Sequence, residues 1–207
     1  DPVFKVNPPL RPIEDVQAVR AALADGTIDA VATDHAPHAR HDKEHAFEDA
    51  AFGMLGLETA LSVVASVMVE GGPCGWSDLA RVMSSAPAGI AGLADHGRPI
   101  VPGEPTNLVL VDPAAAITVD RSSSQSLSRN NPWHGEQFRA AVHTTILRGR
   151  VTASGMAGAG IGADGGITYE NGKIKISGRV YAALGLGGSL GGEITLDVKQ
   201  AAQLAHA

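Results

Sequence analysis

The first 34 residues alternate between two kinds of regular structure, and this order constrains the fold more than any other feature of the chain. Residues 3–6 form a short β-rich run that ends at two prolines. Residues 13–23 carry apolar side chains at helical spacing, after Pro12 at a favoured first helical position. Residues 28–33 are nearly all apolar, as in a strand buried on both faces. The order strand, helix, strand predicts a β/α unit of a parallel sheet.

The middle of the chain changes from helical periodicity to short apolar runs at about Gly97. This change predicts a small β layer that is appended to the α/β part. Residues 39–50 are polar and predict a surface loop or a short exposed helix. The other predicted helices cover residues 55–69, residues 77–83 with Ser77 as N-cap, and residues 87–93, and the predicted strands cover residues 107–111, 116–119 and 140–147.

The last part of the chain has its own composition, because residues 152–207 hold 13 of the 25 glycines. Residues 154–166 are mostly Gly, Ala and Ser, which favours a linker. Asn171–Gly172 lies between alternating residues and predicts a hairpin. A strand at residues 193–198 and a short Ala-rich helix are predicted to follow. We therefore expect three parts, at residues 1–95, 96–151 and 152–207.

Composition excludes several classes of protein. The net charge of −6 argues against a nucleic-acid surface, which needs a basic stripe. The single cysteine excludes an intramolecular disulfide and a zinc site built from several cysteines. We find neither an apolar run long enough for a membrane span nor a signal-peptide pattern, so we expect a cytoplasmic protein. The chain begins with Asp1 rather than Met, which favours a piece of a longer protein.

Asp34 is the sharpest candidate for chemistry, because it directly follows the predicted buried strand at residues 28–33. A carboxylate at the C-terminal end of a parallel strand can ligate a metal and exchange a proton with bound water. The alternative is a turn-capping aspartate beside exposed histidines.

Asn7 follows the other predicted strand of the unit, and its amide offers both a donor and an acceptor, as a cyclic amide substrate requires. The alternative is an Asn that forms a turn before proline. His41 and His45 lie four residues apart, but in a charged segment where a solvated face is the favoured interpretation. For His35 we favour a packed or hydrogen-bonded role.

Three segments resemble the C-terminal third of bacterial dihydroorotases, which belong to the amidohydrolase superfamily. They are residues 4–11, with Asn7-Pro8-Pro9-Leu10-Arg11, residues 29–38, with Thr33-Asp34-His35-Ala36-Pro37-His38, and residues 52–59, with Phe52-Gly53-Met54. They stand in the order of that family, and the resemblance covers roughly residues 1–150. Allantoinases and dihydropyrimidinases share the Asp-His pair but are less similar around Asn7 and around His38.

The resemblance implies an α/β fold, namely the C-terminal part of a (β/α)₈ barrel over residues 1–95 with a small β domain over residues 96–151. A Gly-rich β-type tail of unknown identity follows. The matching positions imply roles as well. Asp34 is the metal-ligating aspartate and the catalytic acid/base. Substrate-binding residues are Asn7 and His38 through their side chains, and Phe52 and Gly53 through their backbone, while Arg11 receives only a structural role.

The reaction that the resemblance implies is the reversible, zinc-dependent hydrolysis of dihydroorotate to N-carbamoyl-aspartate in pyrimidine synthesis. Zn²⁺ lowers the pKa of a bound water toward about 7. Asp34 then accepts the proton of the attacking hydroxide and delivers it to the departing ring nitrogen, which leaves poorly unless protonated. The resemblance also implies a homodimer or an association with aspartate transcarbamoylase.

Other interpretations stay open at this point. The remaining metal ligands of the family have no counterpart in the sequence, so we expect the isolated 207 residues to be inactive. A non-catalytic dihydroorotase-like subunit is the main alternative, and another cyclic amidase is the next. Residues 152–207 lie outside the resemblance; a fusion, a frameshift, a gene-prediction error or an unusual extension would each account for them, and on their own they also suit a Gly-rich interaction module.

Overall fold

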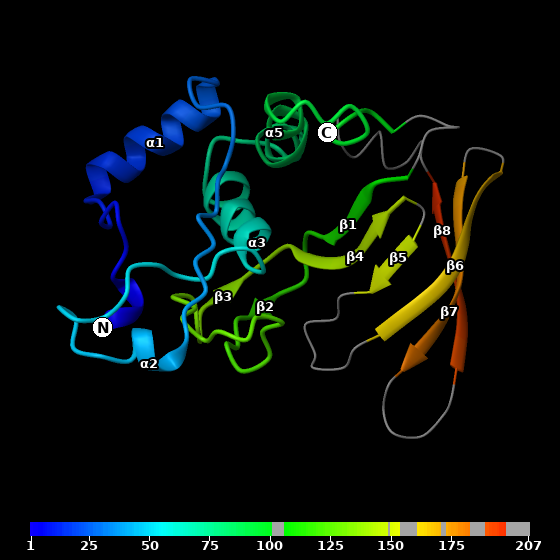
Figure 1. Ribbon diagram of the computed structural model, residues 1–207. Helices are drawn as coiled ribbons and strands as arrows, with labels where there is room; N and C mark the ends of the chain where they lie inside the picture. The colour runs from blue at the N-terminus through cyan, green and yellow to red at the C-terminus, as the bar shows by residue number, and fades with distance from the viewer. Residues whose placement is uncertain (101–105, 149, 154–160, 171–172, 183–188, 198–207) are drawn as a thin grey trace. The chain divides into compact units, whose positions relative to one another are not determined.

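The computed structural model describes residues 1–100, 106–148, 150–153, 161–170, 173–182 and 189–197. The chain divides into two compact units. The first comprises Asp1–Gly92 and Pro113–Ala141, and the second comprises Leu93–Asp112 and Val142–Ala207 (Figure 1). The domain boundaries predicted at residues 95 and 151 stay a prediction.

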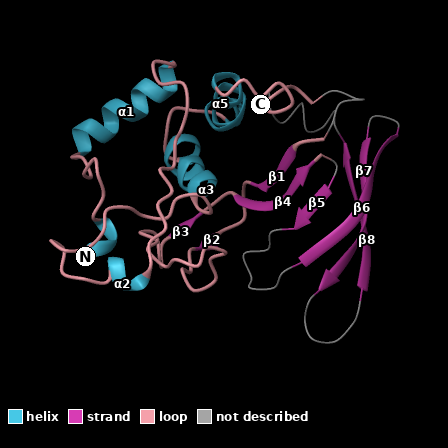
Figure 2. Ribbon diagram, viewed as in Figure 1, coloured by secondary structure: helices cyan, strands magenta, loops and turns pink. Residues whose placement is uncertain are grey.

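The first unit is built mainly from helices and long loops (Figure 2). Its helices are α1 (Ile13–Asp25), α2 (Arg40–Lys43), α3 (Ala60–Val64), α4 (Trp76–Ala80) and α5 (Ala86–Ile90). A 3₁₀ turn covers Pro2–Phe4, and the π-helical segments Ala65–Glu70 and Arg81–Ser85 continue α3 and α4. A short antiparallel pair, β2 (Ile117–Thr118) and β3 (Gln137–Phe138), completes the unit.

Helix α1 follows its sequence signals closely. Pro12 is the N-cap residue rather than the first helical residue, and its backbone is extended. Gly26 ends the helix at φ 87°, a left-handed conformation that glycine adopts without the steric cost of a Cβ. The predicted helix over residues 13–23 is therefore confirmed, and it extends to Asp25.

The other predicted helices are confirmed with shifted ends. The helix predicted over residues 55–69 begins only at Ala60. Ser77 as an N-cap is wrong, because α4 begins at Trp76 and Gly75 is its N-cap. The Gly75 N–H donates to a carboxylate oxygen of Asp78 at 2.9 Å, so the acidic side chain satisfies the helix start. The predicted short exposed helix in residues 39–50 is α2.

The core of the first unit lies between α1 and the two π-helical segments. Leu23, Met68 and Val82 are buried together at its centre. Ile28 and Val31, from the extended segment after α1, pack against them. The Val31 N–H donates to the Val82 carbonyl at 3.0 Å, so this segment is held by a helical residue rather than by a strand.

Both strands predicted in the first 34 residues are wrong. Residues 2–4 form the 3₁₀ turn, because the Asp1 carboxylate accepts a hydrogen bond from the Val3 N–H at 2.9 Å and Phe4 and Lys5 bond back to Asp1 and Pro2. Residues 28–33 are extended but have no ladder partner among the described residues, and a strand needs one. Only the single parallel bridge between His35 and Met54 follows them.

The second unit contains a six-stranded sheet in the order β1-β4-β5-β6-β7-β8. Its strands are β1 (Leu108–Asp112), β4 (Ala141–Leu147), β5 (Arg150–Ala153), β6 (Ile161–Glu170), β7 (Lys173–Ala182) and β8 (Ser189–Asp197). The pairs from β4 to β8 are antiparallel. Strands β1 and β4 confirm the predictions for residues 107–111 and 140–147, and β2 confirms the prediction for residues 116–119 in shortened form.

Several predictions for the Gly-rich part can be compared with these strands. Glu170 pairs with Lys173, so β6 and β7 form the predicted hairpin, although Asn171 and Gly172 themselves lie outside the described residues. The predicted linker is wrong over residues 161–166, which belong to β6, and its remainder lies outside the described residues. The strand predicted at residues 193–198 is β8, and the predicted Ala-rich helix is outside the described residues. No helix in the described part of the chain is long and apolar enough to cross a membrane.

Candidate functional site

Asp34 has an unusual backbone conformation. Its φ is 43°, in the left-handed region that residues with a Cβ seldom occupy and that Asp and Asn tolerate best. Its side chain is exposed at the end of the extended segment 28–33. Left-handed residues other than glycine concentrate at functional sites, where the surrounding structure holds them. The conformation therefore agrees with a functional position for this carboxylate.

His35 lies next to Asp34 and joins two segments that are 20 residues apart. Its Nδ1 accepts hydrogen bonds from the N–H groups of Gly56 at 3.1 Å and Leu57 at 3.3 Å. The next residue, Ala36, donates its N–H to the Met54 carbonyl at 3.0 Å. The prediction of a hydrogen-bonded His35 is confirmed, and because Nδ1 is an acceptor, the proton of the neutral ring resides on Nε2.

Three of the predicted site residues, His38, Phe52 and Gly53, lie together. The Nε2 of His38 and the Phe52 carbonyl oxygen are 2.7 Å apart, and the carbonyl can only accept, so Nε2 donates. Gly53 has φ 132°. A Cβ at that position would lie 2.6 Å from the Ala36 Cβ and 2.9 Å from the His38 Nε2. Only glycine allows this loop to pass so close to the histidine ring.

Asn7 and Asp34 are not joined to this group by hydrogen bonds. Both are exposed, and neither side chain has a hydrogen-bond partner among the residues that the structure describes. The Asn7–Pro8 peptide bond is cis. Arg11 pairs with Asp15 at 2.7 Å across one turn of α1, in agreement with a structural role. His41 and His45 are exposed, as the solvated-face interpretation predicts.

Asn130 is a site residue that the sequence analysis missed. It is buried, and its Nδ2 donates to the carbonyls of Ala36 at 2.9 Å and Gly53 at 3.2 Å. Its own carbonyl accepts from the Leu55 N–H at 3.0 Å. One side chain thus spans the His38 segment and the Gly53 loop. No local pattern marks it, because its partners lie more than 70 residues away in the sequence.

Two lysines fix the start of the Gly53 loop. Lys43 is buried, and its Nζ donates to the carbonyls of Lys5 at 3.0 Å and Ala51 at 2.8 Å. Burial, and then the nearby charge of Lys5, lower the pKa of Lys43 below its ordinary value. The Lys5 Nζ lies 4.7 Å from the centre of the Phe52 ring and donates to the Glu48 carbonyl. The N-terminal segment consequently lies beside α2 (Figure 1).

Glu58 holds a loop from the far end of the first unit. Its carboxylate accepts hydrogen bonds from the Ser124 hydroxyl and from the N–H groups of Gln125 and Ser126. Burial alone would raise the pKa of Glu58, but these three bonds and the nearby His35 together lower it below the ordinary value. The sequence motif at residues 52–59 contained Glu58 without indicating this role.

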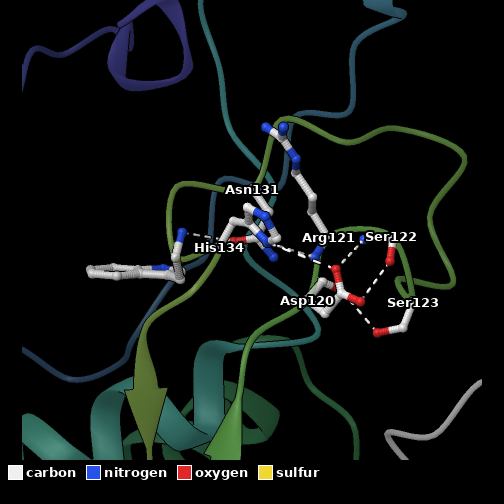
Figure 3. Close-up of polar contacts among 7 residues, drawn as sticks. Asp120, Arg121, Ser122, Ser123, Asn131 and His134 are labelled. Atoms are coloured by element: carbon white, nitrogen blue, oxygen red, sulfur yellow. Dashed lines mark hydrogen bonds and ion pairs between the residues drawn. The ribbon is translucent and has the colours of Figure 1, made fainter.

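A turn at Asp120 begins the segment that leads to Asn130 (Figure 3). The Asp120 carboxylate accepts from the Ser122 N–H at 2.9 Å and from the Ser122 hydroxyl at 2.6 Å. These bonds lower the pKa of Asp120. The Arg121 N–H donates to the His134 Nδ1 at 3.3 Å, and Figure 3 shows the Arg121 side chain extending away from the Asp120 carboxylate.

A cavity of about 260 Å³ adjoins His38 within the first unit. Several of its lining side chains carry positive charge, but most of these charges have partners. Arg40 pairs with Glu44, Lys43 donates to backbone carbonyls, and Arg129 donates to the carbonyls of Ser126 and Ser128. Its lining includes His38, Arg40, Lys43, Arg121, Arg129 and Asn130.

The described residues do not form a complete metal site. No three His, Cys, Asp or Glu side chains within the described ranges lie close enough together to hold a metal ion. Asp34 offers carboxylate oxygens, but a protein zinc site needs three or four ligands. The donor set of the described residues therefore does not fit a bound zinc by itself.

Comparison with known proteins places these features in a family. The model of the amidohydrolase family matches residues 8–152, which include Asp34, His38, Gly53 and Asn130. The chain belongs to the amidohydrolase family. Among curated amidohydrolases, it is 56% identical to the dihydroorotase of Mycobacterium tuberculosis over 153 residues, covering 74% of this chain and 36% of that protein. It is 53% identical to the dihydroorotase of Streptomyces coelicolor over 152 residues, covering 73% of this chain and 36% of that protein. The chain thus spans about a third of the length of the curated relatives it matches.

Solved amidohydrolase structures are similar to the same part of the chain. L-hydantoinase (dihydropyrimidinase) from Arthrobacter aurescens superimposes with a TM-score of 0.69 at 32% identity, covering 74% of this chain and 35% of that one. Dihydropyrimidinase from Brevibacillus agri gives a TM-score of 0.67 at 23% identity, covering 76% and 36%, and supports the fold alone. The α/β amidohydrolase class predicted from the sequence is confirmed.

We expect Gly53→Ala to destabilise this amidohydrolase chain strongly. The new Cβ meets Ala36 and His38, and the backbone conformation adds strain, so the loss is roughly 3 kcal/mol in the free energy of unfolding. Gly26→Ala is the matched control, because Gly26 also has positive φ but a Cβ there meets nothing within 4 Å. It should lose only about 1–2 kcal/mol. Urea unfolding of the two variants measures the difference, and equal losses would contradict the close contact.

We expect Glu58→Gln to change how stability depends on pH. Since folding lowers the pKa of Glu58 from its ordinary value of 4.5, the ionised carboxylate stabilises the fold above that pH. This contribution is lost as the pH falls from 4.5 through the folded-state pKa. Unfolding measured between neutral and acid pH should therefore fall more steeply for the unchanged chain than for Glu58→Gln. The exposed Glu14 of α1 provides the control variant Glu14→Gln, and a slope altered as much by Glu14→Gln would refute the role of Glu58.

Proposed function

We propose that the protein containing this chain is a dihydroorotase, which catalyses the reversible hydrolysis of the cyclic amide dihydroorotate to N-carbamoyl-aspartate. The observation that carries this proposal is the identity above 50% with several bacterial dihydroorotases over the segment that contains the candidate site. Membership of the amidohydrolase family agrees with this chemistry. We also propose a cytoplasmic location and assembly as a homodimer or with aspartate transcarbamoylase.

Asp34 is the proposed acid/base of the reaction. Its exposed carboxylate at the end of the extended segment is free to meet a substrate. It takes the proton of the attacking water and gives it to the ring nitrogen as the amide bond breaks. An amide nitrogen leaves poorly as an anion, so the same carboxyl group must first accept and then donate this proton.

Substrate recognition is assigned to the residues grouped around His38. The imidazole can offer a hydrogen bond or a charge to the carboxylate of the substrate. The backbone groups of Phe52 and Gly53 lie against that ring and present donors and acceptors to the substrate amide. Asn7, whose side chain is exposed, supplies a further amide for the same purpose.

A hydantoinase or dihydropyrimidinase activity is the second candidate, because an L-hydantoinase (dihydropyrimidinase) has a similar structure. The lower identity, 32% against 56%, makes it less favoured. Turnover of dihydroorotate measured beside that of dihydrouracil and hydantoin distinguishes the two. A non-catalytic dihydroorotase-like subunit would turn over none of the three.

We expect Asp34→Asn to abolish most of the activity of the whole protein. Loss of the acid/base group should lower kcat about 10²- to 10⁴-fold, because an amide side chain can neither accept nor donate the proton. The measurement is the ring opening and closing of dihydroorotate. Asp29→Asn is the control, since Asp29 is an exposed carboxylate in the same extended segment, and it should retain full activity. A kcat for Asp34→Asn within tenfold of the unchanged protein would overturn the assignment.

We further propose that zinc is the metal of the whole protein and that Asp34 is one of its ligands. Because the described residues provide no group of three donors, the isolated 207-residue chain should keep less than a stoichiometric amount of zinc after dialysis. It should also show no turnover of dihydroorotate. Metal analysis of the dialysed chain tests this, and tight stoichiometric zinc together with turnover would contradict it.

A further inference from the structure

Asn130 contacts both segments that carry the proposed substrate-binding groups, although it lies 92 residues from His38 in the sequence. Its two amide hydrogens are divided between the segments, one to the Ala36 carbonyl and one to the Gly53 carbonyl. Its Oδ1 lies 3.5 Å from the His38 backbone nitrogen, which is the donor. The side chain is only 5% exposed, so water does not replace these bonds.

The chemistry of these three contacts requires a carboxamide. Two carbonyl acceptors need two donors, and the His38 N–H needs an acceptor, which the amide of Asn130 supplies from one planar group. A carboxylate of the same shape has no N–H and would face two carbonyl oxygens. An aliphatic side chain would leave all three backbone groups without their partner in a buried place.

The backbone of the same segment strengthens this connection. The Ser128 hydroxyl donates to the His38 carbonyl at 2.8 Å, and the Asn130 carbonyl accepts from the Leu55 N–H. Ser128 and Asn130 are both buried and lie two residues apart. Because Glu58 holds residues 124–126 at the start of this segment, its position is fixed at both ends.

Small movements here alter the proposed site directly. Gly53 has no free space toward Ala36 or His38, so the distance between the two segments is determined to within a few tenths of an ångström. The hydrogen bond from the His38 Nε2 to the Phe52 carbonyl orients the ring across that gap. Asn130 therefore acts on the substrate only through His38 and the loop at Phe52 and Gly53.

We propose that Asn130 is a positioning residue, which sets the separation and orientation of His38 and the Phe52–Gly53 backbone for substrate binding. This inference rests on the proposed function. His38 and the loop contact the substrate before and during the reaction, whereas the proton is moved by Asp34, to which Asn130 has no hydrogen bond in the described structure. Loss of the carboxamide should thus weaken binding of substrate and transition state alike, which raises KM and leaves kcat nearly unchanged.

The variant Asn130→Asp in the whole protein tests this, with Asn131→Asp as a matched control. Asn131 is the adjacent residue and is also buried, but its Oδ1 accepts only from the Trp133 N–H in the described structure, and an aspartate keeps that acceptor. We expect Asn130→Asp to raise the KM for dihydroorotate at least tenfold with kcat within threefold. Asn131→Asp should leave both constants within twofold. A KM for Asn130→Asp within twofold of the control, or a fall in kcat as large as the rise in KM, would overturn the inference.

Ser128→Ala keeps the test informative if Asn130→Asp fails to fold. It removes one hydroxyl donor from His38 and leaves the carboxamide in place. We expect a two- to fivefold rise in KM with kcat unchanged, and no rise would count against the segment as a positioning device.

A measurement without substrate separates this inference from the proposed function. The ¹⁵N signal of the His38 Nε2–H reports its bond to the Phe52 carbonyl, and it should shift or broaden in Asn130→Asp and not in Asn131→Asp. If the unchanged protein turns over no dihydroorotate, the proposed function fails, and this signal still decides the role of Asn130. An unchanged His38 signal in a folded Asn130→Asp protein would refute that role.

Discussion

The approach of Gly53 to Ala36 and His38 is the contact on which the rest of the candidate site depends. A Cβ at residue 53 would lie closer to both neighbours than atoms allow, so the loop can take this path only with glycine. The path brings the Phe52 carbonyl to the His38 ring and the Met54 carbonyl to the Ala36 N–H. The turn at Asp34, with its left-handed backbone, directly precedes the segment that receives these contacts.

Side chains hold these two segments where a longer β-ladder would otherwise do so. The parallel pairing amounts to one bridge between His35 and Met54. The remaining backbone groups are met by Asn130, by Lys43 and by the Nδ1 of His35. Within the described residues, no buried side-chain nitrogen or oxygen lacks a hydrogen-bond partner. Such a network is costly to disturb, since removing one member leaves buried backbone groups unpaired.

The extent to which the sequence predicts this arrangement follows from the range of the interactions. Local signals are sufficient for α1, with Pro12 and Gly26 at its ends, and for the β6–β7 hairpin. Short motifs also identified His38, Phe52 and Gly53 as a group. The extended segments at residues 3–6 and 28–33 were predicted as strands, because an apolar run does not reveal whether a neighbouring strand exists. Asn130 could not be found, since an Asn in a loop has no periodicity and its partners are distant in the sequence.

The physical separation of Asp34 from the His38 group bears on how this part of an amidohydrolase works. His38 and Gly53 are fixed by buried hydrogen bonds and close packing, whereas the Asp34 carboxylate is exposed and is oriented by its backbone conformation. A group that moves a proton must change partners during the reaction, and an exposed carboxylate on a constrained backbone can do so without disturbing its neighbours. A group that recognises a substrate gains from rigidity, because less freedom is lost on binding. The two kinds of environment in this chain therefore match the two kinds of work that are assigned to them.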